Sequence, residues 1–325
     1  MKVLDFHNHF YPPAYLDALE AGPSKVQVRK DGEGNPVLGY PGDYNVVVPG
    51  HRDIARRLRD LDAAGVDHQI LTLTTPGTHI EAAPRAAALA TIVNDEFKRI
   101  VDTHSRFQAL GTLPLCDPAA SVREFERLTS ELGFAGVMVF SNINGVALAD
   151  ERFWPLYERA SEHRAVIMIH PTMPVGVESM LDYWLMPLVG FTMDTTLAAA
   201  KLVFAGIPVR FPGIRWVLGH LGGAIPYLAE RLDRGFFAFP ECRAHIDAPP
   251  SQYLREFYYD TVNFDPKALR LALDFAGPGR LLAGSDYPHK IGDLGKMLSS
   301  IAALDLSEAD RKRILCGNAR ELLGL

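Results

Sequence analysis

The sequence of 325 residues predicts a single α/β domain, residues 1–325, folded as a closed parallel (β/α)8 TIM barrel. Eight short apolar segments alternate along the chain with eight longer amphipathic segments, which is the pattern of such a barrel. Most of the short segments are continuously apolar, as strands buried on both faces require. A doubly wound open sheet is the alternative, but nothing in the chain resembles its glycine-rich dinucleotide-binding turn.

The expected elements follow one another in strand–helix order. The short segments, predicted as barrel strands, are Val3–His7, His68–Leu73, Phe107–Leu113, Ala135–Val139, Val166–His170, Ile214–Gly219, Phe257–Thr261 and Arg280–Gly284. The amphipathic segments, predicted as the outer helices, are Asp53–Ala64, Pro84–His104, Ala119–Leu132, Arg152–His163, Thr195–Ala205, Ala224–Phe237, Pro266–Phe275 and Leu294–Leu304.

Two long segments interrupt this alternation. Pro12–Gly50 follows the first strand, is rich in glycine and proline, and is too long for an ordinary strand–helix loop. We expect it to form an insertion on the rim, over the mouth of the barrel. Pro171–Asp194 is a second long insertion, after the fifth strand. Beyond Leu304 the sequence predicts C-terminal helices, with Ser307 as the first N-cap.

The composition counts against several classes of protein. The 33 Lys and Arg residues are outnumbered by 39 Asp and Glu and form no evident basic stripe, so no nucleic-acid partner is expected. No apolar run approaches the roughly 20 residues of a membrane helix, and no secretory leader is evident at the start. The three cysteines (Cys116, Cys242 and Cys316) lie far apart, which counts against disulfides and favours a cytoplasmic location.

Histidines occur where several predicted strands end. His7 and His9 are two residues apart on the first strand, so their side chains share one face and can converge on one ion. His170, His220 and Asp286 follow the fifth, sixth and eighth strands. Such a histidine pair alone is weak support for a metal site. All five residues, however, lie at the carboxyl ends of predicted barrel strands, where these barrels have their active sites.

The fourth strand helps to predict the number of metal ions. Barrel hydrolases with the same histidine pair usually bridge two metals through a modified lysine after this strand, but Gly136–Phe140 contains no lysine. We therefore expect one divalent ion, with four candidate ligands: His7, His9, His170 and Asp286. Three nitrogens and one oxygen favour Zn2+, with Mn2+ as the alternative. His220 would lie beside the ion and transfer a proton.

Motifs along the whole chain resemble those of a known family. They are HNHFYPP, GVDHQIL, LGTLPL, ELGFAGV, IHPT, DYWLMPLVG, FPGIRWVLGHLGGAIPYLAERLDRGF, LLAGSDYPH and GNARELLGL. In this order they resemble the mononuclear, amidohydrolase-related (amidohydrolase 2) branch of the amidohydrolase superfamily, and are most similar to the 2-amino-3-carboxymuconate-6-semialdehyde decarboxylases. The resemblance implies metal ligands in HNH, IHP and SDYP, and a catalytic histidine, His220, in GHLGG.

The resemblance also implies a substrate-binding arginine and a homodimer. Arg231 matches an arginine that reaches the site of a neighbouring subunit and holds a substrate carboxylate, as a planar guanidinium can. The alternative is a surface arginine paired with Glu230 or Asp233.

Other substrate-binding positions of the family are not matched. Its second arginine aligns near Tyr44 or Asn45, which makes Arg52 the nearest replacement. The other arginines of the Asp53–Ala64 helix (Arg56, Arg57 and Arg59) are expected on a solvated face. The substrate-packing tryptophan of the family falls at Pro187, so Trp184 either lines the mouth or simply packs. His289 is a further candidate for binding substrate, or caps a loop, and the run Tyr258–Asp260 is expected to pack.

The function expected from these features is a metal-dependent, non-oxidative decarboxylase. Its substrate would be a small unsaturated or aromatic carboxylic acid, phenolic or amino, with His220 and Asp286 as catalytic residues. A hydrolase of an ester, lactone or amide, or a hydratase, is the alternative on the same scaffold, because a metal-bound water near a histidine serves all three reactions. A non-catalytic binding protein is the alternative from another class.

Overall fold

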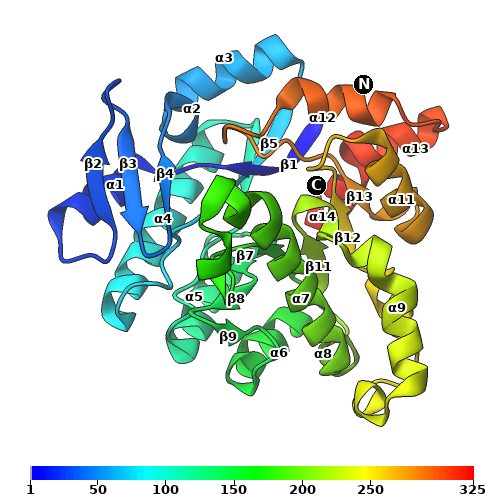
Figure 1. Ribbon diagram of the computed structural model, residues 1–325. Helices are drawn as coiled ribbons and strands as arrows, with labels where there is room; N and C mark the ends of the chain where they lie inside the picture. The colour runs from blue at the N-terminus through cyan, green and yellow to red at the C-terminus, as the bar shows by residue number, and fades with distance from the viewer. Residues whose placement is uncertain (1) are drawn as a thin grey trace.

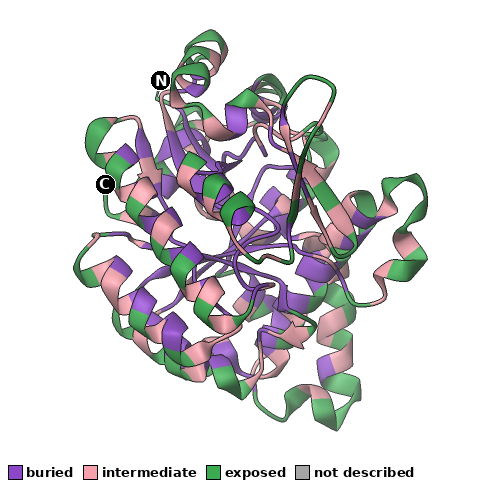
Figure 2. Ribbon diagram, turned by 90° about the vertical axis from the view of Figure 1, so that its left-hand side faces the viewer, coloured by how far each residue is buried: buried purple, intermediate pink, exposed green. Residues whose placement is uncertain are grey.

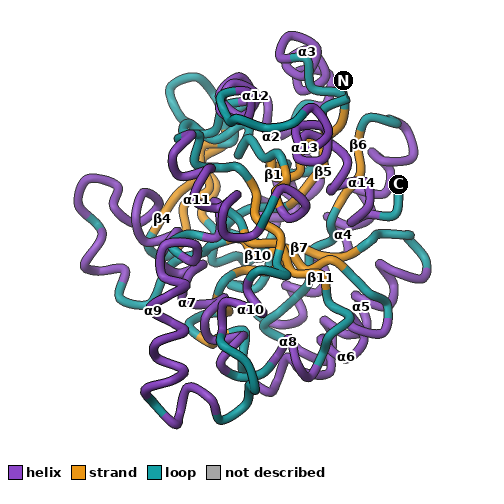
Figure 3. The backbone as a smooth tube through the Cα atoms, turned by 90° about the vertical axis from the view of Figure 1, so that its right-hand side faces the viewer, coloured by secondary structure: helices purple, strands orange, loops and turns teal. Residues whose placement is uncertain are grey.

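The computed structural model describes residues 2–325 and consists of parallel strands enclosed by helices (Figure 1, Figure 3). The barrel strands are β1 (Leu4–His9), β5 (His68–Thr72), β6 (Phe107–Ala109), β7 (Gly136–Phe140), β10 (Val166–His170), β11 (Arg215–Leu218), β12 (Tyr258–Asp260) and β13 (Leu281–Leu282). They pair in parallel as two sheets, in the orders β1-β5-β6 and β13-β12-β11-β10-β7. Each predicted strand is present, several of them shorter than expected.

Backbone hydrogen bonds join the two sheets at both edges. At one edge, the N–H of Phe6 donates to the carbonyl of Ala283 (2.7 Å). At the other, Gly111 donates to Gly136 (3.0 Å) and Met138 donates to Gly111 (2.9 Å). The predicted TIM-barrel fold is therefore confirmed. The strand ladder is not one continuous sheet, however, because the strands at these edges are too short for regular pairing.

The outer helices correspond to the predicted ones. They are α3 (Ile54–Ala64), α4 (Ala83–Thr103), α5 (Pro118–Ser130), α6 (Trp154–Glu162), α7 (Phe191–Phe204), α9 (Ile225–Ala238), α11 (Pro266–Ala276) and α12 (Leu294–Ala302). Four of them begin at an aspartate that accepts a hydrogen bond from the first turn (Asp53, Asp117, Asp265 and Asp293). The buried residues gather on the faces that meet the strands (Figure 2). Helix α7 begins four residues before the predicted Thr195, because the turn η4 (Met186–Gly190) leads directly into it.

The first insertion has structure that the sequence did not predict. It contains α1 (Pro13–Ala21), α2 (Pro49–Arg52) and an antiparallel sheet of β2 (Gln27–Lys30), β3 (Pro36–Tyr40) and β4 (Asp43–Val46), which stands beside the barrel in Figure 1. The Asn45 amide donates to the carbonyl of Thr75 (2.8 Å), just after β5. The Tyr44 ring centroid lies 5.2 Å from that of Trp184. These contacts hold the insertion on the rim, as predicted.

The remaining strands and α-helices are short. They are β8 (Asn142–Ile143), β9 (Val146–Ala147), α8 (Ile207–Arg210), α10 (Pro250–Leu254), α13 (Glu308–Lys312) and α14 (Asn318–Leu323). The second insertion forms the turns η2 (Val177–Met180), η3 (Asp182–Trp184) and η4. In the tail, Ser307 accepts from the N–H of Asp310 (3.0 Å) and caps α13, as predicted. Among residues 2–325, no helix combines the length and apolarity needed to span a membrane.

Candidate metal centre

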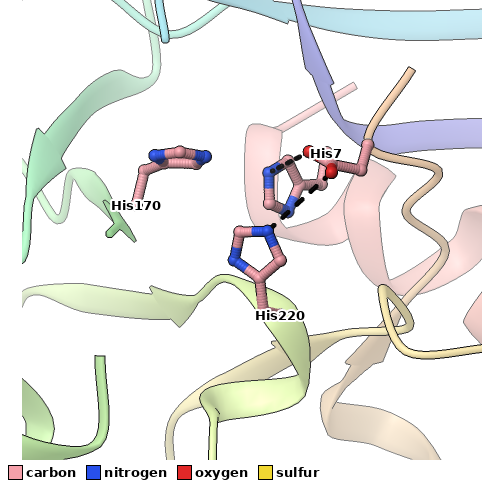
Figure 4. Close-up of side chains that lie close together, drawn as sticks. His7, His170 and His220 are labelled. Atoms are coloured by element: carbon pink, nitrogen blue, oxygen red, sulfur yellow. Dashed lines mark ion pairs between the residues drawn. The ribbon is translucent and has the colours of Figure 1, made fainter. Parts of the chain in front are cut away.

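Histidine rings and one carboxylate converge at the carboxyl ends of β1, β10, β11 and β13 (Figure 4). His7 Nε2 lies 3.1 Å from His9 Nε2 and 3.6 Å from Asp286 Oδ1. His9 Nε2 lies 3.1 Å from the same carboxylate oxygen. The His170 ring centroid lies 4.7 Å from that of His9, and all four side chains are buried. The structure thus brings together the four predicted ligands.

The other ring nitrogen of each of these histidines is already engaged. The Nδ1 atoms lie near Asp260 Oδ2 for His7, Thr72 Oγ1 for His9 (3.1 Å) and the Pro171 carbonyl for His170 (2.7 Å). An Nδ1–H donated to such an acceptor leaves Nε2 unprotonated in the neutral ring. This is the usual arrangement of metal-binding histidines, whose second nitrogen is held by a carboxylate or carbonyl. The donor set therefore fits a divalent metal ion.

His220 lies in the same cluster but differs from the other histidines. Its Nε2 is 3.9 Å from Asp286 Oδ2, and its Nδ1 is buried without a hydrogen-bond partner in residues 2–325. Two overlapping groups have ligand atoms within 4.8 Å of one another: His7, His170, His220 and Asp286, and His9, Asp286 and His289. Distance alone therefore does not separate ligands from their neighbours. The missing partner at Nδ1 distinguishes His220 from the three histidines whose Nδ1 is engaged.

Asp260 is a site residue that the sequence analysis missed. Its buried carboxylate accepts from His7 Nδ1 and from the backbone N–H groups of His220 (3.0 Å) and Leu221 (2.9 Å). His220 and Leu221 have positive φ angles, 52° and 58°, which residues other than glycine disfavour. The assignment of Tyr258–Asp260 to packing was wrong for Asp260. The signal in the sequence was the position of Asp260 at the end of β12, because the other site residues also lie at the carboxyl ends of barrel strands.

Burial and neighbouring charges set the protonation of the centre. Burial lowers the pKa values of His9, His170 and His220, which keeps these rings neutral. For His7, burial acts in the same direction, but the carboxylates of Asp260, Asp286 and Asp5 together outweigh it and raise the pKa. Burial opposes the charge of Asp286, yet the surrounding histidines lower its pKa overall. A neutral imidazole and an ionised carboxylate are the forms that bind metal.

The sequence model of the family described as Amidohydrolase matches residues 4–325. The chain belongs to this amidohydrolase family. It is 34% identical over 274 residues to 2-amino-3-carboxymuconate-6-semialdehyde decarboxylase of Dictyostelium discoideum, covering 83% of this chain and 76% of that one. It is 31% identical over 331 residues to 6-methylsalicylic acid decarboxylase of Penicillium expansum, covering 99% of this chain and 96% of that one. The resemblance noted in the sequence is thereby confirmed.

Solved structures of two decarboxylases have the same fold. The 5-carboxyvanillate decarboxylase of Sphingomonas paucimobilis superposes with a TM-score of 0.87 at 25% identity, over 100% of this chain and 99% of that one. A dihydroxybenzoic acid decarboxylase from Polaromonas sp. JS666 was solved with manganese and the inhibitor 2-nitroresorcinol. It superposes with a TM-score of 0.81 at 26% identity, over 99% of this chain and 96% of that one.

The predicted substrate-binding residues of this amidohydrolase are dispersed. His289 lies beside the centre, with its ring centroid 4.9 Å from that of His9. Arg52 donates to the carbonyl of Val47 (3.3 Å) and to Asn35 (3.4 Å), so its guanidinium is held within the rim insertion. The structure thus brings His289, but not Arg52, to the metal ligands.

The two other predicted residues lie on the surface. Arg231 is exposed on α9 and makes no ion pair with any residue of the described chain, including Glu230 and Asp233. Trp184 is 52% exposed and packs against Tyr44 of the rim insertion. Within residues 2–325, neither makes a hydrogen bond, ion pair or ring contact with the proposed metal ligands.

Arg57 corrects one expectation about this amidohydrolase. Its neighbours Arg56 and Arg59 are exposed, as expected, but Arg57 is fully buried. It donates to Asn8 Oδ1 (2.6 Å), Gln69 Oε1 (3.0 Å) and the His9 carbonyl. Its Nε and Nη2 also donate to the Gly50 carbonyl (3.2 and 3.0 Å), so four acceptor atoms stabilise the charge of Arg57 where a solvated face was predicted. Arg57 thus fixes the strand that presents His7 and His9.

Proposed function

We propose that this chain is a metal-dependent, non-oxidative decarboxylase of a small unsaturated or aromatic carboxylic acid, phenolic or amino. The observation that carries the proposal is the convergence of three imidazole rings, those of His7, His9 and His170, on Asp286, with His220 beside them. The names of the relatives support the reaction: decarboxylases of 6-methylsalicylic acid, of 5-carboxyvanillate and of 2-amino-3-carboxymuconate-6-semialdehyde. The free cysteines are consistent with a cytoplasmic protein.

One divalent ion would be held by His7, His9, His170 and Asp286. The nitrogen-rich set favours Zn2+, while manganese bound in the related dihydroxybenzoic acid decarboxylase supports Mn2+ as the alternative. When bound, the metal would act as a Lewis acid that orients the carboxylate and an adjacent oxygen of the substrate.

His220 and Asp286 would transfer the proton that the reaction consumes. The ring carbon bearing the carboxylate takes up a proton, the bond to the carboxylate carbon breaks, and its electron pair returns to the ring as CO2 leaves. His220 would move the proton toward that carbon, because its Nε2 lies 3.9 Å from Asp286 Oδ2 and its ring is not held at Nδ1. Asp286 would bind the metal and take part in the same proton transfer.

We also propose that the chain acts as a homodimer in which Arg231 binds the substrate carboxylate in the partner's site. An exposed apolar surface on the second insertion and its neighbours supports a protein partner. Its members are Leu181 (63% exposed), Tyr183 (86%), Trp184 (52%), Leu188 (51%), Val189 (44%), Met193 (45%) and Leu197 (48%). Arg231 and Tyr227 (77%) are exposed on α9, which contacts α7.

The test follows CO2 release from metal-loaded protein, with a panel of hydroxybenzoates, aminobenzoates and muconate-type acids. Simple esters and lactones are included, because a hydrolase is the alternative on this scaffold. We expect CO2 from at least one acid, with loss of activity on chelation and recovery with Zn2+ or Mn2+. Cleavage of an ester or lactone without CO2 from any acid would overturn the proposal in favour of a hydrolase.

A further inference from the structure

A second pair of histidines adjoins the proposed metal ligands. His289 follows Asp286 in the loop after β13, and ligand atoms of His9, Asp286 and His289 lie within 4.8 Å of one another. His51 lies on α2 of the rim insertion, with its ring centroid 4.9 Å from that of His289 and 5.4 Å from that of Tyr11. The pair therefore lies between the rim insertion and the centre.

The two nitrogens of His51 need partners that the described chain does not supply. The residue is 1% exposed, and both Nδ1 and Nε2 are buried without a hydrogen bond to any of residues 2–325. Burial, and then the neighbouring His289, lower the pKa of His51, so the His51 ring is neutral. A neutral imidazole has one donor and one acceptor. Buried polar atoms are rarely left unpaired, so these nitrogens point to a bound group.

We infer that His51 and His289 form a subsite that recognises a neutral hydroxyl or amino substituent on the substrate ring. The inference rests on the proposed decarboxylase function and assigns residues that select among its substrates. A hydroxyl or amino group has a hydrogen to donate and a lone pair to accept, which matches the two nitrogens of a neutral ring.

A second carboxylate would suit this subsite less well. It only accepts hydrogen bonds, and its charge would need a cation in a buried place. The arginines of α2 and α3 that lie near His51 in the chain are engaged elsewhere: Arg52 donates to Val47, and Arg57 to Gly50 and the His9 carbonyl. The subsite therefore favours a neutral substituent.

The test compares 2,6-dihydroxybenzoate with 2-hydroxybenzoate, which differ by one ring hydroxyl. Dissociation constants are measured by calorimetry on the metal-loaded protein, and kcat/KM is measured where CO2 is released. We expect the dihydroxy acid to bind roughly tenfold more tightly, as one added hydrogen bond predicts. His51→Phe and His289→Phe should bring this ratio close to one. His51→Gln, which keeps a donor and an acceptor, should restore part of it.

His79→Phe is the matched control. His79 is also a buried histidine with an unpartnered Nδ1, but its ring packs on Phe140 at a centroid distance of 4.6 Å. Its replacement should leave the ratio unchanged. Equal weakening of both acids in His51→Phe, with the ratio preserved, would assign His51 a structural role and overturn the inference.

The binding ratio also separates this inference from the proposed function. A protein that binds both acids with the expected ratio but releases CO2 from no acid would contradict the decarboxylase and not the subsite. A wild-type ratio near one, with CO2 released, would contradict the subsite and not the decarboxylase. Failure of the metal-loaded protein to bind either acid would contradict the subsite, whereas the decarboxylase is contradicted only when no acid of the panel releases CO2.

Discussion

The Asp260 carboxylate connects His7 to His220. One of its oxygens accepts from His7 Nδ1 and also from the backbone N–H of His220 at 3.0 Å. The same side chain thereby orients a proposed metal ligand and holds the proposed proton carrier in a left-handed backbone conformation. The metal and the proton-transfer group are thus positioned by one buried residue, although His7 and Asp260 are 253 residues apart in the sequence.

Asp260→Asn should weaken metal binding about 10- to 100-fold. The amide can turn its NH2 group toward His7 Nδ1, which would then accept the hydrogen bond and leave the proton on Nε2, the nitrogen that faces the metal. Competition with a chromogenic chelator measures the affinity. Asp274→Asn is the control, because Asp274 is an exposed residue of α11 paired with Arg270. Unchanged affinity in Asp260→Asn would show that this carboxylate does not set the ring orientation.

His220→Gln should lower kcat by about 10²- to 10⁴-fold while the protein keeps its metal, because the residue transfers a proton without binding the ion. His9→Gln should instead lose the metal. Metal content by mass spectrometry and CO2 release are measured on both variants. Loss of the metal from His220→Gln, with retention in His9→Gln, would exchange the roles of the two residues.

Arg231→Ala should raise KM and inactivate the partner's site. Co-expression of Arg231→Ala and His220→Ala chains tests this directly, because half of the dimers are hybrids with one intact site. About a quarter of the wild-type activity should return in the co-expressed mixture, and about half in the separated hybrid, although each homodimer alone is inactive. The measurement is CO2 release from the mixture and from the separated hybrid. No recovery in a hybrid whose dimeric state is verified would place Arg231 in its own chain's site or outside any site.

Arg57→Met should destabilise the protein by about 3 kcal/mol, because it leaves several buried acceptors unpaired. Burial lowers the pKa of Arg57 to about 10, so the guanidinium is still charged at neutral pH. Urea unfolding at saturating metal gives the free energy. Arg56→Met, which removes only the exposed pair with Asp60, should cost at most about 0.5 kcal/mol. Similar losses in the two variants would contradict the anchoring role of Arg57.

His79 should make the protein less stable in acid. Burial lowers its pKa from 6.5 to about 3, so the unfolded chain binds a proton between these values that the folded chain does not. As the pH falls, proton binding to His79 in the unfolded chain therefore lowers the free energy of unfolding by up to about 1.4 kcal/mol per pH unit. His79→Phe should reduce the loss between about pH 6 and about pH 5 by roughly 1 kcal/mol in urea unfolding. Identical pH slopes would contradict a buried neutral His79.

Local sequence determined much of this protein. Apolar segments long enough to be buried on both faces, separated by amphipathic segments, predicted the order of the strands and outer helices. His7, His9, His170, His220 and Asp286 were identifiable because each follows or ends such a strand, and parallel strands all present their carboxyl ends at one edge. A single periodic pattern therefore predicted both the fold and the cluster.

Only the tertiary structure decided how that cluster is supported. Asp260 and Arg57 lie in segments whose local pattern indicates packing or solvation, yet each meets β1 from a distant part of the chain. The small sheet β2-β3-β4 and the place of His51 likewise depend on contacts between insertions and the rim. The physical reason is that periodicity reports which face of a segment is buried. A buried polar group is stabilised by its particular partner, and folding alone brings that partner near.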